Sequence, residues 1–95
     1  MVKVIEIRPR RKSGPLRAFA DVSLGDLVVK DFRVMQGIGG KPYVKAPFTT
    51  YKDETGRLKF RQIIDLPDKV RGEVDTLILS EYYRREKELK NGKQR

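Results

Sequence analysis

Neither cysteine nor histidine occurs among the 95 residues of the chain. Without cysteine the chain forms no disulfide bonds and offers no thiolate metal ligands. Without histidine it lacks the commonest general base and the commonest zinc ligand. The acidic residues are dispersed, and no pair of carboxylates stands out as acid and base. We therefore expect neither enzymatic activity nor a bound metal, cofactor or small-molecule substrate.

Long apolar segments are missing as well. No stretch approaches the roughly 20 apolar residues that span a bilayer, and residues 1–7 include charged side chains, unlike a signal peptide. The sequence therefore predicts a cytoplasmic protein that does not bind membranes. Its 95 residues suit one domain with a modest core, expected at 1–90 and followed by a basic tail at 91–95. Because a core of this size provides only a small free energy of unfolding, we expect self-association to stabilise the fold further.

The excess of positive charge lies at the two ends of the chain. The net charge is +9, from 22 basic and 13 acidic residues. Residues 1–17 contribute +5 and residues 84–95 contribute +4, whereas residues 18–83 carry ten charges of each sign. Basic ends favour a polyanionic partner such as nucleic acid. A soluble surface with a lysine-rich tail is the alternative interpretation.

Turn residues divide the chain into five strand candidates and one helix. Turns are predicted at 13–15, 25–26, 37–40 and 53–56. The strand candidates are rich in Val, Ile, Phe and Tyr and lie at 2–10, 16–24, 27–36, 42–48 and 57–64. A helix over 67–89 is predicted by apolar residues at helical spacing, Val70, Val74, Leu77 and Ile78. The expected fold class is α+β: an antiparallel β-sheet of about five strands with one long C-terminal α-helix.

A two-residue turn at 25–26 would fix the register of the strands beside it. The expected pairs are Leu24–Leu27, Val22–Val29 and Ala20–Asp31 on one face, and Asp21–Lys30 and Phe19–Phe32 on the other. Phe19, Phe32 and Val34 then make the second face too apolar for open solvent. Since one helix covers only one face, we expect a homodimer in which a second copy covers the other. The alternative is that residues 42–64 fold over this face within one chain.

Several short segments occur together in an order that resembles one known family. They are Arg8–Arg11 with Leu16–Ala20, Val29–Met35 with Gly37, Tyr43–Pro47, Phe60–Ile63, and Arg71-Gly72 with Glu81-Tyr82. Over about residues 4–83 the chain resembles the stage V sporulation protein G family, whose members are also called septation proteins. It departs from the family pattern at Lys45-Ala46, at Gln62, at 65–67 and in the basic run after Arg84.

The resemblance implies a small dimeric protein of one sheet and one helix that binds DNA and RNA. It also implies a role in regulating gene expression. In sporulating bacteria the family is connected with septation and sporulation.

The first candidate interface is a basic group near the N-terminus, Arg8, Arg10, Arg11, Lys12 and Arg17. Arg8 and Arg10 are two residues apart, so on a strand they project from one face with about 7 Å between them. Such a pair can contact neighbouring phosphates of one nucleic-acid strand. The alternative is an edge strand whose charges prevent aggregation.

The second candidate interface is the helix end, with Arg84, Arg85, Lys87 and Lys90 beside Tyr82 and Tyr83. A tyrosine here can stack on an unpaired base, or it can anchor the helix on the sheet. The cations can contact phosphates, or they can compensate the helix dipole and pair with nearby glutamates. Arg71, in the first turns of the helix, is a weaker candidate.

Two further features are interpreted as structural. Asp31 and Arg33 face small alanines in the expected register, which favours an ion pair under the helix; if the site opens between subunits, Arg33 binds phosphate instead. Residues 37–41 lack the spacing of a phosphate-binding loop and are expected to form a hairpin loop.

Taken with the resemblance, these residues predict a regulatory protein that binds DNA or RNA as a dimer through its basic surface. The alternative is a protein-interaction module that acts on cell-division or regulatory partners without contacting nucleic acid. Neither the preferred nucleic-acid sequence nor the regulated genes follow from the residues.

Overall fold

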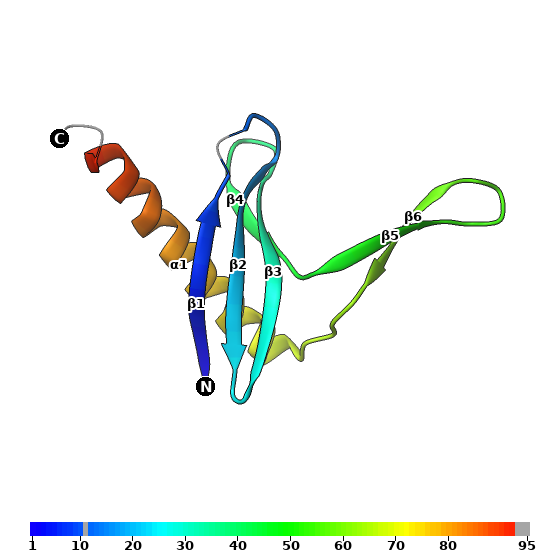
Figure 1. The fold of residues 1–95 in the computed structure, drawn as a ribbon, viewed down its shortest axis with the longest axis horizontal. Helices are drawn as coiled ribbons and strands as arrows, with labels where there is room; N and C mark the ends of the chain where they lie inside the picture. The colour runs from blue at the N-terminus through cyan, green and yellow to red at the C-terminus, as the bar shows by residue number, and fades with distance from the viewer. Residues whose placement is uncertain (11, 93–95) are drawn as a thin grey trace.

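Six strands and one helix make up the fold (Figure 1). The computed structural model describes residues 1–10 and 12–92, with side chains up to residue 88 in the helix. The elements are β1 (Val2–Pro9), β2 (Leu16–Leu24), β3 (Leu27–Gln36), β4 (Pro42–Lys45), β5 (Phe48–Lys52), β6 (Leu58–Gln62) and α1 (Asp68–Gly92). Strands β1 to β4 form an antiparallel sheet in sequence order, and β5 and β6 form a separate two-stranded sheet. The predicted α+β class is therefore confirmed.

The predicted strand at 42–48 is divided into two. Strand β4 ends at Lys45 and β5 begins at Phe48, with Pro47 between them. Proline lacks the N–H that a strand ladder needs, so the chain leaves the first sheet at this point. It continues into the β5–β6 hairpin, which projects away from the rest of the molecule (Figure 1).

The predicted turn at 53–56 closes this hairpin. The Oδ1 atom of Asp53 accepts hydrogen bonds from the backbone N–H groups of Thr55 and Arg57, both at 2.9 Å. The hydroxyl of Thr55 also donates to this oxygen, at 2.7 Å. This bond, followed by the backbone bonds, holds the pKa of Asp53 below its ordinary value. The side chain of Asp53 thus fixes the turn, as aspartates commonly do.

Helix α1 packs across one face of the four-stranded sheet (Figure 1). Its first turn closes where the N–H of Arg71 donates to the carbonyl of Pro67. Val74, Ile78 and Tyr82 are four residues apart and are all buried, so they form the stripe that faces the sheet. The helix was predicted over 67–89 and ends at Gly92, within the segment expected to be a tail. Residues 93–95 of that tail lie outside the described residues.

A bulge changes the register of β2 and β3. The turn at Gly25 and the pairs Leu24–Leu27 and Val22–Val29 are as predicted. Beyond them Ala20 faces Phe32, and Phe19 faces Arg33, so the predicted pairs Ala20–Asp31 and Phe19–Phe32 are wrong. Lys30 and Asp31 together occupy the place opposite Asp21, and Asp31 has a φ of 68°. An extra residue of this kind sends every following side chain to the other face.

The bulge places Phe32 and Val34 in the core. Both are fully buried beneath α1 together with Ala18, Ala20 and Val22. The predicted apolar second face is therefore wrong for Phe32 and Val34. The predicted ion pair of Asp31 with Arg33 under the helix is also wrong, because Asp31 is exposed and Arg33 lies over aromatic rings instead.

Within the described residues, no helix combines the length and the apolar character needed to cross a membrane.

Candidate nucleic-acid interface

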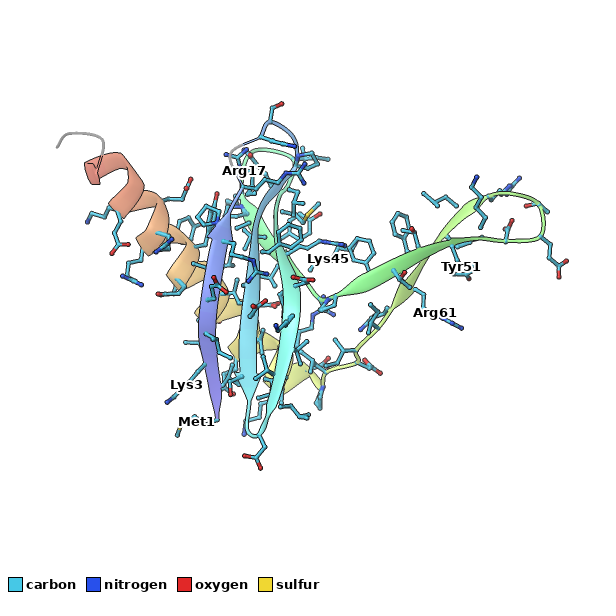
Figure 2. All side chains as sticks on the ribbon, viewed as in Figure 1. Met1, Lys3, Arg17, Lys45, Tyr51 and Arg61 are labelled. Carbon is cyan, nitrogen blue, oxygen red and sulfur yellow. The ribbon has the colours of Figure 1, made fainter. Side chains whose placement is uncertain are left out.

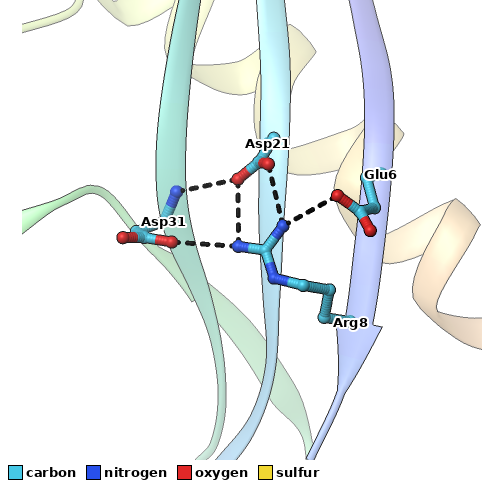
Figure 3. A network of polar contacts seen from close by, with 4 residues as sticks. All are labelled: Glu6, Arg8, Asp21 and Asp31. Atoms are coloured by element: carbon cyan, nitrogen blue, oxygen red, sulfur yellow. Dashed lines mark hydrogen bonds and ion pairs between the residues drawn. The ribbon is translucent and has the colours of Figure 1, made fainter.

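The open face of the sheet carries a network of ion pairs around Arg8 (Figure 3). The guanidinium donates to both carboxylate oxygens of Asp21, at 2.8 and 3.1 Å. It also donates to Glu6 at 3.1 Å and to Asp31 at 2.9 Å. Asp21 accepts a further hydrogen bond from the backbone N–H of Asp31 at 3.1 Å, so the bulge itself helps to bind this carboxylate.

This network is more acidic than basic. Asp21 is 6% exposed, and the hydrogen bonds from Arg8 lower its pKa below the ordinary value. The same hydrogen bonds, which Arg8 donates to Asp21, raise the pKa of Arg8. One guanidinium is shared among three carboxylates, so the charge of Arg8 is already compensated within the fold. Arg8, a predicted phosphate contact, is therefore engaged with carboxylates of its own sheet.

The rest of the first basic group lies towards one end of the sheet. Arg10 and Lys12 are exposed, and the N–H of Arg10 donates to the carbonyl of Arg17 at 2.7 Å. Arg17 is half-buried at this end (Figure 2). Arg11 lies outside the described residues. The structure therefore leaves Arg10, Lys12 and Arg17 without an ion-pair partner among the residues it describes.

The cations of the helix end differ from one another. Arg84 is held by Glu81 at 2.5 Å and Glu88 at 2.9 Å, and the bonds to Glu81 raise its pKa. Lys87 is exposed, and Arg85 is half-buried with its Nε atom lacking a hydrogen-bond partner among the described residues. The side chain of Lys90 lies outside the described residues. Pairing with glutamates, an alternative considered for the helix end, thus accounts for Arg84.

The two tyrosines of the helix have separate positions. Tyr82 is buried in the core, and its hydroxyl lies 3.4 Å from a carboxylate oxygen of Glu86. Tyr83 is exposed, with its ring centroid 5.9 Å from that of Tyr82. Tyr82 therefore anchors the helix, and Tyr83 presents an aromatic ring to solvent.

Arg17 and the helix-end tyrosines line a cleft of about 310 Å³, here called the end cleft. It is lined by Arg17, Gln36, Gly40, Pro42, Tyr82, Tyr83 and Glu86. Arg17 comes from the N-terminal basic group and Tyr83 from the helix end. The fold thus brings Arg17 and both tyrosines of the helix end to the same cleft, with one carboxylate, that of Glu86, in its wall; Arg84, Arg85 and Lys87 do not line it.

A second cationic surface lies where the sheet meets the hairpin. The guanidinium carbon of Arg33 lies 4.0 Å from the ring centroid of Phe48 and 5.9 Å from that of Phe19. The Nζ atom of Lys45 lies 4.7 Å from the centroid of Phe48 and 5.4 Å from that of Phe60. Both cations are attracted by the faces of these rings.

Another cleft, of about 250 Å³ and here called the Phe60 cleft, opens beside these cations. It is lined by Lys45, Ala46, Phe48, Phe60, Gln62 and Arg71. Arg71 comes from the start of α1, so the helix supplies one wall and the hairpin another. The weaker candidate Arg71 is thus placed next to two aromatic rings and a second cation.

The opposite face of the hairpin is also basic. Strand pairing places Thr49 opposite Arg61 and Tyr51 opposite Lys59, so these four side chains share one face. The guanidinium carbon of Arg61 lies 6.0 Å from the centroid of the Tyr51 ring. Figure 2 shows Tyr51 and Arg61 on the projecting hairpin.

Sequence reasoning missed this second surface because it counted charge along the chain. Residues 18–83 carry ten charges of each sign, which gives no net signal. The fold separates these charges, since it gathers Asp21 and Asp31 around Arg8 and leaves Arg33 and Lys45 beside rings. The available signal was the interleaving of aromatic and basic residues within 43–61, which is typical of single-strand binding.

No group of three or more acidic side chains is placed to hold a metal ion in the part of the chain that the structure describes. A scan against models of known protein families finds no match to this chain, and a search of curated proteins finds none either. The resemblance to the stage V sporulation protein G family therefore stays a prediction from short motifs.

Proposed function

We propose that this protein binds DNA and RNA through its cationic surfaces, with little preference for base sequence. The observation that carries the proposal is the end cleft, where Arg17 of the first basic group lies with Tyr83 of the helix end. Exposed cations near this end neutralise phosphates and release counterions, and an exposed ring offers a stacking surface. Arg10, Lys12 and Lys87 are exposed, and the backbone hydrogen bond from Arg10 to Arg17 places Arg10 at this end.

A role in regulating gene expression, in the manner of the stage V sporulation protein G family, is part of the same proposal. So is a cytoplasmic location. Septation and sporulation enter only through the resemblance, and no residue described above bears on them.

We also propose that the protein acts as a homodimer. The bulge removes the original reason for expecting one, but another observation supports it. Among the described residues, no strand pairs with 27–32 of β3 on the side away from β2. A groove of about 450 Å³ runs along this edge and is partly lined by Val28, Pro47 and Ile63. A second copy that adds a strand here would satisfy the free backbone groups and cover apolar surface.

Salt dependence tests the binding proposal. About five phosphate contacts predict that a plot of log affinity against log salt concentration has a slope of about −3.5 to −4.5. Titration of labelled duplex DNA, single-stranded DNA and RNA at several salt concentrations measures this slope. A flat response, or no binding at low salt, contradicts the proposal.

A matched pair of variants then locates the surface. Arg17→Gln removes one charge at the end cleft, and Lys3→Gln removes one charge at the far end of β1 (Figure 2). We expect Arg17→Gln to make the slope shallower by about 1 for every nucleic acid. Lys3→Gln should leave the slope unchanged. Equal effects of the two substitutions would show that net charge alone, and not the end cleft, governs binding.

A protein-interaction module is the second candidate function. It is favoured by the exposed apolar side chains of the hairpin and the following segment, Leu58, Phe60 and Ile63. Association with a partner protein that persists after nuclease treatment would support this candidate. Loss of the association on nuclease treatment would support nucleic-acid binding.

A further inference from the structure

We propose that the Phe60 cleft binds one nucleotide of a single-stranded nucleic acid, with the unpaired base stacked on Phe60 and its phosphates beside Lys45 and Arg71. The inference rests on the proposed function and adds a second site to it, with a preference for single strands. Neither basic end contributes to this cleft, and Arg71 is the one predicted site residue among the six that line it.

The two phenylalanines of the cleft have different surroundings. The ring of Phe48 lies under Arg33 and Lys45, at 4.0 and 4.7 Å from its centroid. It also meets the ring of Phe60 edge to face, with 5.5 Å between centroids and 64° between planes. These contacts fix Phe48 and, through it, orient Phe60.

Phe60 itself remains open to solvent. It is 62% exposed. Six residues form its face of the hairpin, and Phe48 and Leu58 are the other two apolar ones. A large exposed ring held in a fixed orientation is a stacking surface for any base, because every base has a π-face. Stacking on Phe60 therefore explains a feature that the four-stranded core does not require.

The charges around the ring select a polyanion. Lys45 lies 5.4 Å from the centroid of Phe60, and Arg71 lines the cleft from the helix side. No carboxylate is among the six residues that line it. A base stacked on Phe60 carries its phosphates past these two cations, where they release counterions.

Gln62 supplies the polar group of the cleft. Its Nε2 atom donates to the carbonyl of Ile64 at 2.6 Å, which holds the side-chain amide in place. A fixed amide beside a stacking ring can hydrogen-bond the edge of a base without demanding one base identity.

The site distinguishes single strands from duplexes. In a duplex both faces of each base are covered by its neighbours, so a protein ring stacks only on a base that has left the helix. The volume of the cleft, about 250 Å³, is below the range of ordinary small-molecule pockets. It therefore suits one nucleotide of a longer strand. At the end cleft the exposed ring of Tyr83 likewise suits an unpaired base, whereas the cations around that cleft contact the phosphates of either form.

Substitution of Phe60 tests the inference. Labelled single-stranded DNA of mixed sequence, a duplex of the same sequence and free adenosine monophosphate are titrated against the full chain. Phe60→Ala should weaken single-strand binding about tenfold or more and leave duplex binding within about twofold. Leu58→Ala is the matched control, since Leu58 is 59% exposed on the same face but does not line the cleft. It should leave both affinities unchanged.

Two further variants test whether Phe60→Ala acts through stacking or through destabilisation of the hairpin. Arg71→Gln removes one cation of the cleft from the helix side and changes no residue of the hairpin, so it should weaken single-strand binding selectively. Phe60→Trp creates the only tryptophan in the chain, which has none of its own. Its fluorescence should be quenched on addition of the single strand, weakly or not at all by the duplex, and only weakly by the mononucleotide.

The outcomes separate this inference from the proposed function. If the unmodified chain binds no nucleic acid at low salt, the proposed function fails and the inference fails with it. If the chain binds, but Phe60→Ala retains single-strand affinity or weakens both forms equally, only the inference is overturned. Strong quenching of Phe60→Trp by the duplex would overturn it as well.

Discussion

Asp21 shows how one side chain can organise a sheet. It is the buried charged residue of the described chain, and its carboxylate accepts three hydrogen bonds, two from Arg8 and one from the backbone of Asp31. A buried carboxylate is tolerated only when it is paired and hydrogen-bonded. Arg8 therefore has a structural role at this position, because its guanidinium is already paired with carboxylates of the sheet.

Asp21→Ala should destabilise the protein by about 2 kcal/mol. The substitution leaves the N–H of Asp31 without its acceptor. It also leaves Arg8 paired only with Glu6 and Asp31, which are more exposed than Asp21. The loss stays below that of a fully buried pair because the side chain of Arg8 is 38% exposed. Asp21→Asn, which keeps the shape and an acceptor oxygen, should lose about half as much. Urea unfolding measures both, and equal stability of Asp21→Ala and the unmodified chain would refute a structural role.

The same residue predicts a pH dependence. The pKa of Asp21 is lower in the folded chain than its ordinary value of 3.8, so the unfolded chain takes up this proton first as the pH falls. Its contribution to stability is therefore complete above about pH 5 and is lost as the pH falls through 3.8 and then through the lower pKa of the folded chain. The difference in unfolding free energy between the unmodified chain and Asp21→Asn should shrink over this range. Asp53 and Glu81, whose pKa values are also lowered, remain in both proteins and do not affect the difference.

At the scale of elements, the bulge in β3 decides which side chains enter the core. Without it Phe32 would face away from the helix; with it Phe32 is 1% exposed and packs beneath α1. The bulge requires a positive φ at Asp31, a conformation that aspartate tolerates better than most residues.

Asp31→Val should cost about 2 kcal/mol, because a β-branched residue at positive φ is strained. Asp31→Asn should cost less than about 1 kcal/mol, since asparagine accepts this conformation and only a partly exposed ion pair is lost. Urea midpoints for the two variants check the difference. If valine is tolerated as well as asparagine, the bulge does not depend on the backbone of residue 31.

The β5–β6 hairpin has the weakest support of any element. Its residues pair with each other and make few contacts with the four-stranded sheet or the helix, and isolated two-stranded hairpins are marginally stable in water. We expect its backbone amides to exchange with solvent at least about a hundredfold faster than those of β2. Hydrogen exchange measured without and with single-stranded DNA should show slowing confined to the hairpin and the start of α1. Full protection in the free chain would mean that another molecule covers the hairpin.

At the scale of the whole molecule, the proposed dimer accounts for the free edge of β3. Sedimentation at micromolar concentration should give about twice the chain mass of 11.0 kDa. Ile63→Glu places a charge in the groove beside this edge and should shift the equilibrium to monomer. Ile38→Glu, at an exposed turn outside the groove, is the matched control and should leave the dimer intact. A monomer at this concentration for the unmodified chain would end the dimer proposal.

Much of the element order was predictable from local patterns. The turn at Gly25, the helical spacing of Val74 and Ile78 and the Asp53 turn are each encoded by a few neighbouring residues. The bulge was not predictable, because it depends on Asp21 in another strand. The division at Pro47 was missed although proline marks it. Phe48 has strong strand propensity, which fits the end of one strand over 42–48 as well as the start of a new strand.

The sequence by itself determined the fold class, the absence of thiol and imidazole chemistry and the excess of positive charge. Only the tertiary structure decided which cations are free to meet a phosphate. The reason is that ion pairs and ring contacts form between residues far apart in the chain: Arg8 reaches Asp21 and Asp31, whereas Lys45 reaches Phe60. Net charge is a property of composition, but a binding surface depends on which side chains the fold leaves unpaired.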